Sequence, residues 1–427
     1  MQILRRGSRG PQVELLQLGL SRAGYLPSQG IDGIFGSATQ MAVTAFQRSV
    51  RLYADGIAGP RTWAELEPWL LGYRVHTVRR GDSLYRIAQA YGSSIRAIDI
   101  ANPDLDPLNL RIGRKLTVPL DFDAVPTNIR FTSTVLDYVV RGLTARYPFL
   151  TVGRMGYSVL GKPLYWLSIG EGEREVFYNA AHHANEWITT PLLMKFLESY
   201  ARAYAFEGSI GGQSAAELYR SATLYIAPMV DPDGVDLVTG ELAAGSAAYA
   251  KAQRISADYP AVPFPSGWKA NINGVDLNLQ YPAGWEDARE IKFAQGFTSP
   301  APRDYVGAAP LDQPESRAIY NFTLEHDFTL TLSYHAQGSV IFWKYRDYEP
   351  AGSYAIGQRF SQLSGYTLEL TPPESANAGY KDWFIQKYNR PSYTIEVGRG
   401  VSPLPLSQFD DIYRANEGIL TEGMILQ

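Results

Sequence analysis

Residues 176–188 read Val-Phe-Tyr-Asn-Ala-Ala-His-His-Ala-Asn-Glu-Trp-Ile, an apolar run of strand type that leads into two histidines and a glutamate. His183 and Glu186 stand three residues apart, so one helical turn directs both side chains toward the same ion. His182 stands four residues from Glu186, and spacing alone does not choose between the two histidines. His335, at the end of another apolar run, supplies a third ligand. The pattern predicts one Zn²⁺ per chain, with a fourth position open for water, and therefore favours a metallohydrolase.

The composition limits the classes of function. The 427 residues are 45% hydrophobic and 12% aromatic, enough for several folded units with at least one large core. A net charge of -4 provides no broad basic surface, so we do not expect a nucleic-acid partner. The absence of cysteine excludes disulfides and thiolate ligands. The sequence contains no apolar run of membrane-spanning length and no readable export signal at its start, so we expect no membrane insertion.

Residues 1–72 contain a short internal repeat, in which Asp32-Gly33 and Asp55-Gly56 each form a turn before a predicted helix. Capping boxes at Ser37-x-x-Gln40 and Thr62-x-x-Glu65 predict where these helices begin. Apolar residues at three- and four-residue steps indicate a compact three-helix unit. The unit resembles the helical peptidoglycan-binding domain found beside cell-wall hydrolases. The motifs that carry this resemblance are Gly10-Pro11-Gln12-Val13, Leu16-Gln17, Gly24-Tyr25, Asp32-Gly33, Phe46-Gln47, Asp55-Gly56 and Thr62-Trp63.

Residues 73–120 form a second unit. A strand is expected over residues 73–78, two helices follow, the first capped by Ser83, and residues 116–119 close the unit as a second strand. This β-α-α-β order, with Gly81-Asp82-Ser83-Leu84 and Asn102-Pro103, resembles a LysM domain, which implies binding of N-acetylglucosamine-containing glycans. Either module alone could be a small stable spacer. Two different wall-type modules in tandem predict peptidoglycan as the partner.

A polar linker over residues 121–128 precedes the domain expected at residues 129–427. Fully apolar strand-like runs alternate there with helical stretches, which predicts an α/β sheet covered by helices on both faces. His183, His335 and Glu396 all lie at or just after the carboxyl ends of predicted strands. Because active groups of such sheets sit beyond these ends, we expect the three to line one crevice.

The motif at residues 180–188 is similar to the zinc motif of the carboxypeptidase A family of metallopeptidases, and the similarity extends from residue 125 to the end. It implies a carboxypeptidase-like fold with a mixed central sheet, and it selects His183 over His182. Ser333-Tyr334-His335 is similar to the strand of the third ligand. Tyr393-Thr394-Ile395-Glu396 is similar to the strand that bears the general base, which would be Glu396.

Gly274-Val275-Asp276-Leu277-Asn278 resembles the family's Gly-Val-Asp-x-Asn-Arg segment. The resemblance implies that Asp276 accepts the N–H of a ligand histidine and that Asn278 hydrogen-bonds the substrate. Leu279 then stands where the family has the arginine that binds the substrate's terminal carboxylate. Because leucine cannot replace a bidentate clamp, we do not expect simple C-terminal trimming of proteins.

Other departures concern the remaining substrate-binding residues. Asn185 occupies a usual arginine position, and the oxyanion-stabilising arginine is missing, so Lys269 or Asn271 is expected to support the oxyanion. Tyr380 is the nearest candidate for the family's mobile active-site tyrosine. Lys381 aligns with the base of the specificity pocket, where its ammonium would meet the side-chain carboxylate of diaminopimelate. The alternative for Lys381 is a solvated surface residue.

Two wall-binding modules before such a domain resemble the γ-D-glutamyl-L-diamino acid endopeptidases of spore-forming bacteria. The resemblance implies zinc-dependent hydrolysis of the γ-D-Glu–diaminopimelate bond in murein stem peptides, at the cell wall or the spore. Location in the mother-cell cytoplasm or non-classical export stays open. The alternatives are a metallocarboxypeptidase acting on peptide or murein tripeptide ends, and a non-catalytic wall-binding protein.

Overall fold

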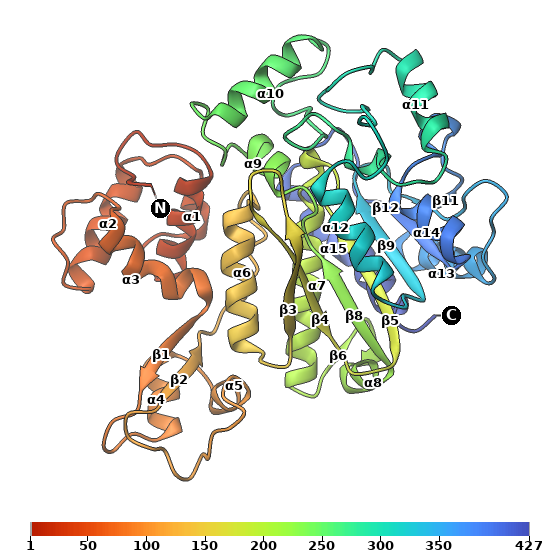
Figure 1. Cartoon of the computed structure of the whole chain (residues 1–427). Coiled ribbons are helices and arrows are strands. Elements are labelled where there is room, and N and C mark those ends of the chain that lie inside the picture. Colours follow the sequence, from red (N-terminus) through yellow and green to blue (C-terminus); the bar gives the residue numbers. More distant parts are fainter. Residues whose placement is uncertain (1, 427) are drawn as a thin grey trace. The chain divides into compact units, whose positions relative to one another are not determined.

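The computed structural model describes residues 2–426 and divides into two compact units, residues 1–151 and residues 152–427 (Figure 1). No helix within residues 2–426 is both long enough and apolar enough to cross a membrane.

The first unit begins with the expected three helices, α1 (Pro11–Arg22), α2 (Ser37–Ser49) and α3 (Pro60–Leu71), and a short turn of 3-10 helix, η1 (Ser28–Gly30). The two predicted capping boxes are wrong. The residues before α2 and α3 are Gly36 and Gly59, neither of which has a side chain to cap the helix.

Buried glutamines take the place of the caps. Gln17 Nε2 donates to Asp32 Oδ1 (2.8 Å) and to Thr39 Oγ1 (3.0 Å), which joins the Asp-Gly turn to the start of α2. Gln47 repeats this arrangement with Asp55 (2.9 Å) and Thr62 (3.1 Å). The internal repeat thus consists of two similar turn-to-helix connections. In each, the side-chain amide of one glutamine hydrogen-bonds several buried partners at once.

The next four elements are β1 (Tyr73–Thr77), α4 (Leu84–Tyr91), α5 (Ile95–Ile100) and β2 (Lys115–Pro119). This is the predicted β-α-α-β order, with β1 and β2 paired antiparallel. Ser83 caps α4 as expected, by accepting from the backbone N–H of Arg86. Helix α6 (Ser133–Arg146) ends the unit and packs on α3.

The sheet of the second unit has eight strands in the order β11-β10-β12-β9-β5-β8-β4-β3 (Figure 1). In chain order these are β3 (Thr151–Tyr157), β4 (Pro163–Ile169), β5 (Arg174–Ala180), β8 (Ala222–Ala227), β9 (Leu330–His335), β10 (Val340–Phe342), β11 (Thr367–Glu369) and β12 (Ser392–Glu396). The four central strands β12, β9, β5 and β8 are parallel, whereas β10 and β4 pair antiparallel with them. The expected mixed sheet is confirmed.

Helices cover both faces of this sheet. Phe177 and Tyr178 are successive residues of β5, so their side chains point to opposite faces. Phe177 packs on Phe322 of α12 (Pro314–Leu324) and on Tyr380 of α14 (Tyr380–Tyr388). The hydroxyl of Tyr178 donates to the carbonyl of Leu420 in α15 (Phe409–Glu422), which packs with α7 (Thr189–Ala205). The other helices of the unit are α8 (Ala215–Ser221), α9 (Pro232–Thr239), α10 (Ala247–Ala257), α11 (Trp285–Ala294) and α13 (Ser353–Ser364).

Candidate active site

The carboxyl ends of three neighbouring parallel strands deliver the predicted site residues. Strand β5 ends three residues before His183, β9 ends on His335, and β12 ends on Glu396. The strand register places Glu396 directly opposite His335. Parallel pairing therefore brings residues from three distant parts of the sequence to one edge of the sheet.

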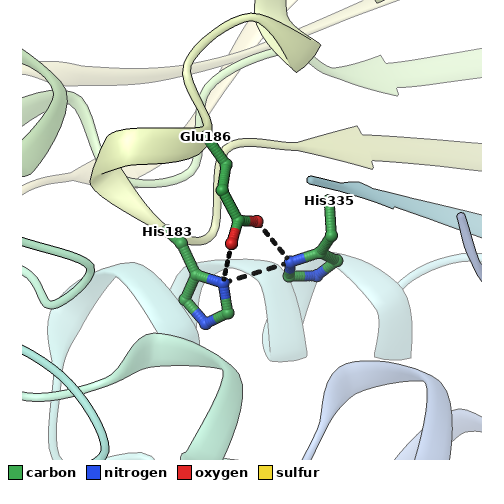
Figure 2. A group of neighbouring side chains, drawn as sticks. All are labelled: His183, Glu186 and His335. Atoms are coloured by element: carbon green, nitrogen blue, oxygen red, sulfur yellow. Dashed lines mark hydrogen bonds and ion pairs between the residues drawn. The ribbon is translucent and has the colours of Figure 1, made fainter. Parts of the chain in front are cut away.

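His183, Glu186 and His335 converge with their polar atoms facing one another (Figure 2). His183 Nδ1 lies 3.0 Å from Glu186 Oε1, and His335 Nδ1 lies 2.9 Å from Glu186 Oε2. The two Nδ1 atoms are 3.2 Å apart. A 3-10 turn, η2 (Ala184–Glu186), separates the first two residues and sets them on the same side of the chain.

These distances fit a zinc ion. With Zn–N bonds of ~2.0–2.1 Å and tetrahedral angles, two ligand nitrogens lie roughly 3.3 Å apart. The separation of the two Nδ1 atoms, 3.2 Å, is close to that value. Two imidazoles and one carboxylate are also a usual donor set for catalytic zinc. The three residues can therefore hold the ion.

His182, the alternative ligand by spacing, lies outside this group. It is fully buried, and its Nε2 lies 3.0 Å from the hydroxyl of Tyr281.

Asp276 contacts the ring of His183 on the side opposite the other two ligands. Its Oδ1 lies 3.0 Å from His183 Nε2, which leaves Nδ1 of the same ring free to face the other two ligands. Asp276 also accepts the backbone N–H groups of Asn278 and Asp304, at 3.1 and 3.2 Å. Burial alone would raise the pKa of Asp276, but His183, Lys269 and the backbone N–H of Asp304 hold it well below the usual range. Asp276 is therefore a charged acceptor that fixes the tautomer and orientation of the ring.

Lys269 approaches the same centre. Its Nζ lies 2.8 Å from Glu186 Oε1. Burial would lower the pKa of this ammonium, but the charge of Glu186 raises it above its ordinary value. Lys269 is therefore a fixed positive charge beside the three ligands.

Glu396 faces the same pocket without a hydrogen bond to its side chain among the described residues. Burial raises its pKa to about 8, and the negative charge of Glu186 adds to this effect. A divalent cation between Glu186 and the two histidines would oppose the shift, since it places positive charge beside the carboxylate. A carboxylate beside a metal-bound water can accept a proton from it and return that proton to a leaving amine.

A pocket of about 570 Å³ opens over this centre. The predicted residues in its lining are His183, His335, Glu396, Lys269, Asp276, Asn278 and Lys381. Asn278 is fixed there, because its Oδ1 accepts the backbone N–H of Tyr380. Leu279 and Asn185, the positions where the resemblance led us to expect arginines, also line it.

Two expectations are corrected. Asn271 is fully buried and hydrogen-bonds Gln313 (2.8 Å) and Glu315 (3.2 Å), so it braces the loop rather than facing the pocket. Tyr380 is also fully buried, and its hydroxyl lies 3.0 Å from Thr323 Oγ1 in the packed core beneath α12. Neither side chain is among the pocket-lining residues.

Lys381 is not a surface residue. Only 3% of it is exposed, and its Nζ contacts Asp382 Oδ1 (2.5 Å) and the carbonyl of Lys344 (2.8 Å). An ammonium has three N–H groups, so one remains for another acceptor.

Sequence reasoning missed one charged segment of the pocket wall. Arg303 and Asp304 lie in it, together with Lys292 from α11. No motif marks these residues. The one signal was a pair of adjacent opposite charges in a loop, which is too common to indicate a site.

Comparison with known proteins accords with this geometry. The zinc carboxypeptidase family pattern matches residues 137–417. The chain belongs to this family. Patterns for a peptidoglycan binding domain and a LysM domain match residues 9–66 and 76–119. The chain is thus a zinc metallopeptidase that also carries two wall-binding modules.

Among its relatives is gamma-D-glutamyl-L-diamino acid endopeptidase 1 of Lysinibacillus sphaericus, 45% identical over 289 residues that cover 67% of this chain and 70% of the relative. Bovine carboxypeptidase B is 24% identical and covers 60% of each chain. Among solved structures, bovine thrombin-activatable fibrinolysis inhibitor superposes with a TM-score of 0.52 at 18% identity, over 69% of this chain and 95% of that one. This superposition shows the carboxypeptidase fold.

Proposed function

We propose that this zinc carboxypeptidase family member is a peptidoglycan hydrolase that cleaves the amide between γ-D-glutamate and diaminopimelate in murein stem peptides. The observation that carries the proposal is the convergence of His183, Glu186 and His335 beside a pocket that Glu396 lines. Leu279, at the position where the resemblance puts the terminal-carboxylate arginine, lines the same pocket. The Lysinibacillus relative, whose name states this activity, supports the choice of bond.

The residues divide the chemistry of amide hydrolysis among them. A zinc ion bound by His183, Glu186 and His335 would polarise the scissile carbonyl and acidify a water molecule. Glu396 accepts the proton that water loses as its oxygen bonds to the carbonyl carbon. Glu396 then returns this proton to the amine nitrogen as the C–N bond breaks. Asp276 keeps the ring of His183 in the orientation and tautomer that this arrangement needs.

Lys269 is our candidate for stabilising the oxyanion. Its ammonium is held beside the ligands by Glu186, at 2.8 Å, and it lines the pocket. A positive charge already in place where negative charge develops costs no reorganisation during the reaction.

Lys381 is our candidate for the distal carboxylate of diaminopimelate. Two of its N–H groups are engaged by Asp382 and Lys344, which fixes the ammonium in the pocket wall and leaves the third to the substrate. A substrate with a neutral or cationic side chain in place of diaminopimelate would lack the ion pair with Lys381.

The two N-terminal modules support action at the cell wall. Tethering the peptidase to a polymer that carries its substrate raises the effective substrate concentration without new contacts at the active site. We propose that the protein acts on peptidoglycan of the wall or of the spore.

The test is mass spectrometry of a defined L-Ala-γ-D-Glu-diaminopimelate-D-Ala peptide digested with the zinc-loaded protein. We expect L-Ala-D-Glu and diaminopimelate-D-Ala as products. Release of the terminal D-Ala alone would identify a carboxypeptidase instead. An amidated or extended C-terminus should leave cleavage intact, because Leu279 stands at the position that the resemblance gives to the arginine clamp of the terminal carboxylate.

A further inference from the structure

The positive charges of the pocket are unequally compensated. Lys269 pairs with Glu186, and Lys381 pairs with Asp382. Lys292 and Arg303 share one carboxylate, that of Asp304. Asp304 thus pairs with Lys292 at 2.7 Å and with Arg303 at 2.5 Å, so these two cations have one negative charge between them and this part of the pocket wall carries a net positive charge.

Arg303 is held through its Nε, which leaves the two terminal nitrogens of its guanidinium free for a ligand. Its Nε donates to Asp304 Oδ2 at 2.5 Å, whereas its two terminal nitrogens make no hydrogen bond to the described residues. These nitrogens are the pair that grips a carboxylate with two parallel bonds. The side chain is 41% exposed and lines the pocket, so a ligand can reach it.

The segment that carries Arg303 is tied to the metal centre. The backbone N–H of Asp304 donates to Asp276 Oδ2 at 3.2 Å, and Asp276 in turn holds His183. Asp304 adopts a left-handed backbone conformation, φ 64°, which aspartate tolerates better than most residues with a side chain. The backbone that carries Arg303 is therefore anchored to Asp276, and its side chain lines the pocket that His183 and Glu396 also line.

The proposed substrate supplies a carboxylate for this position. In a γ-linked D-glutamate the chain continues through the side-chain carboxyl, so the α-carboxylate is free, negatively charged and on the acyl side of the scissile bond. An ordinary α-peptide has no carboxylate there. Lys381 is assigned to the amine side, where diaminopimelate lies, so the two cations have two separate partners.

We infer that Arg303 is a specificity-determining residue that binds the free α-carboxylate of the γ-linked D-glutamate and so selects this isopeptide bond. The inference rests on the proposed function. It implies that the enzyme discriminates against stem peptides in which this carboxylate is amidated to D-isoglutamine, since the guanidinium would then lose its charged partner.

The experiment compares kcat/KM for L-Ala-γ-D-Glu-diaminopimelate with that for its D-isoglutamine counterpart. For the unaltered enzyme we expect amidation to lower kcat/KM by on the order of 100-fold, as for loss of a charged hydrogen-bond partner. Arg303→Gln should lower kcat/KM for the acid by a similar factor but change it for the amide less than about threefold. Arg303→Lys should fall between, because it keeps the charge and loses the two-bond geometry.

The control is Arg414→Gln, which removes an exposed arginine outside the pocket and should leave the discrimination unchanged. Zinc content and the thermal midpoint of Arg303→Gln establish that the variant is folded. An unaltered enzyme indifferent to amidation, or an equal loss on both peptides in Arg303→Gln, would overturn the inference.

Failure of the proposed function gives a different result, namely that neither peptide is cut at the γ-bond. Calorimetric binding of the two peptides to zinc-loaded Glu396→Gln, with and without Arg303→Gln, then decides on Arg303 separately. Tighter binding of the acid that disappears with Arg303→Gln supports the inference, and equal binding of both peptides overturns it.

Discussion

Nε2 of His183 lies 3.0 Å from Oδ1 of Asp276, a residue 93 positions later in the chain. This bond decides which nitrogen of the ring faces Glu186 and His335. It also links the zinc ligands to the loop that carries Arg303, because the second oxygen of Asp276 accepts the backbone N–H of Asp304.

Asp276→Asn should weaken zinc binding by about 10–100-fold, because an amide is a poorer acceptor for the ligand histidine and does not raise its basicity. Competition with a chromogenic chelator measures the affinity. Asp347→Asn, which alters an exposed aspartate, should bind zinc as the unaltered chain does. Unchanged affinity in Asp276→Asn would remove Asp276 from the proposed site.

Glu396→Gln should lower kcat by roughly 10²–10⁴-fold, since the amide cannot take up the proton of the attacking water. Zinc content should stay at one ion per chain, because Glu396 is not among the three converging ligands. The comparison combines metal analysis with peptide hydrolysis. Retained activity would exclude Glu396 as the general base, and loss of zinc would show that it acts as a ligand.

Lys381→Met should destabilise the peptidase domain by about 3–5 kcal/mol, because it leaves the carboxylate of Asp382 buried without its counter-ion. Asp382 is only 2% exposed. The double variant Lys381→Met, Asp382→Asn removes both charges and should recover part of this loss. Denaturant unfolding followed by tryptophan fluorescence gives the comparison. If the double variant is folded but cuts diaminopimelate and lysine stem peptides with unchanged preference, Lys381 does not read the distal carboxylate.

Asp231 predicts a pH effect on stability. This residue is fully buried, and burial together with the charge of Glu315 raises its pKa well above the ordinary value of 3.8. Because the pKa is raised in the folded state, the contribution of protonated Asp231 to the free energy of unfolding is fully present below pH ~3.8. This contribution is lost as the pH rises through the folded-state pKa. Asp231→Asn removes this loss of stability, because asparagine does not ionise.

The free energy of unfolding of Asp231→Asn, relative to that of the unaltered chain, should therefore increase between pH 4 and pH 7. Gly234 N–H can still be accepted by the amide oxygen, as it now is by Asp231 Oδ1 at 3.0 Å. Denaturant titrations at several pH values test this. A difference that is independent of pH would show that Asp231 is ionised in the fold.

The sequence by itself determined the zinc ligands, the strands that carry them and the identity of the N-terminal modules. These features are encoded locally, in a His-x-x-Glu spacing, in apolar runs that end on polar residues, and in turn motifs at fixed offsets. Glu186 and His335 could be named because a strand end predicts its own place at the sheet edge, whereas the choice of His183 over His182 came from the resemblance to the carboxypeptidase A family.

Tertiary structure alone decided what surrounds those ligands. The start of α14 buries Tyr380 in the core, and Asn271 binds Gln313 and Glu315 far along the chain. Gln17 and Gln47 replaced the expected capping boxes, because a buried amide can satisfy a turn and a helix start together. Arg303 lines the pocket on a loop whose next residue, Asp304, donates its backbone N–H to Asp276. Burial and hydrogen-bond partners of this kind depend on contacts between distant segments, which a local sequence pattern does not encode.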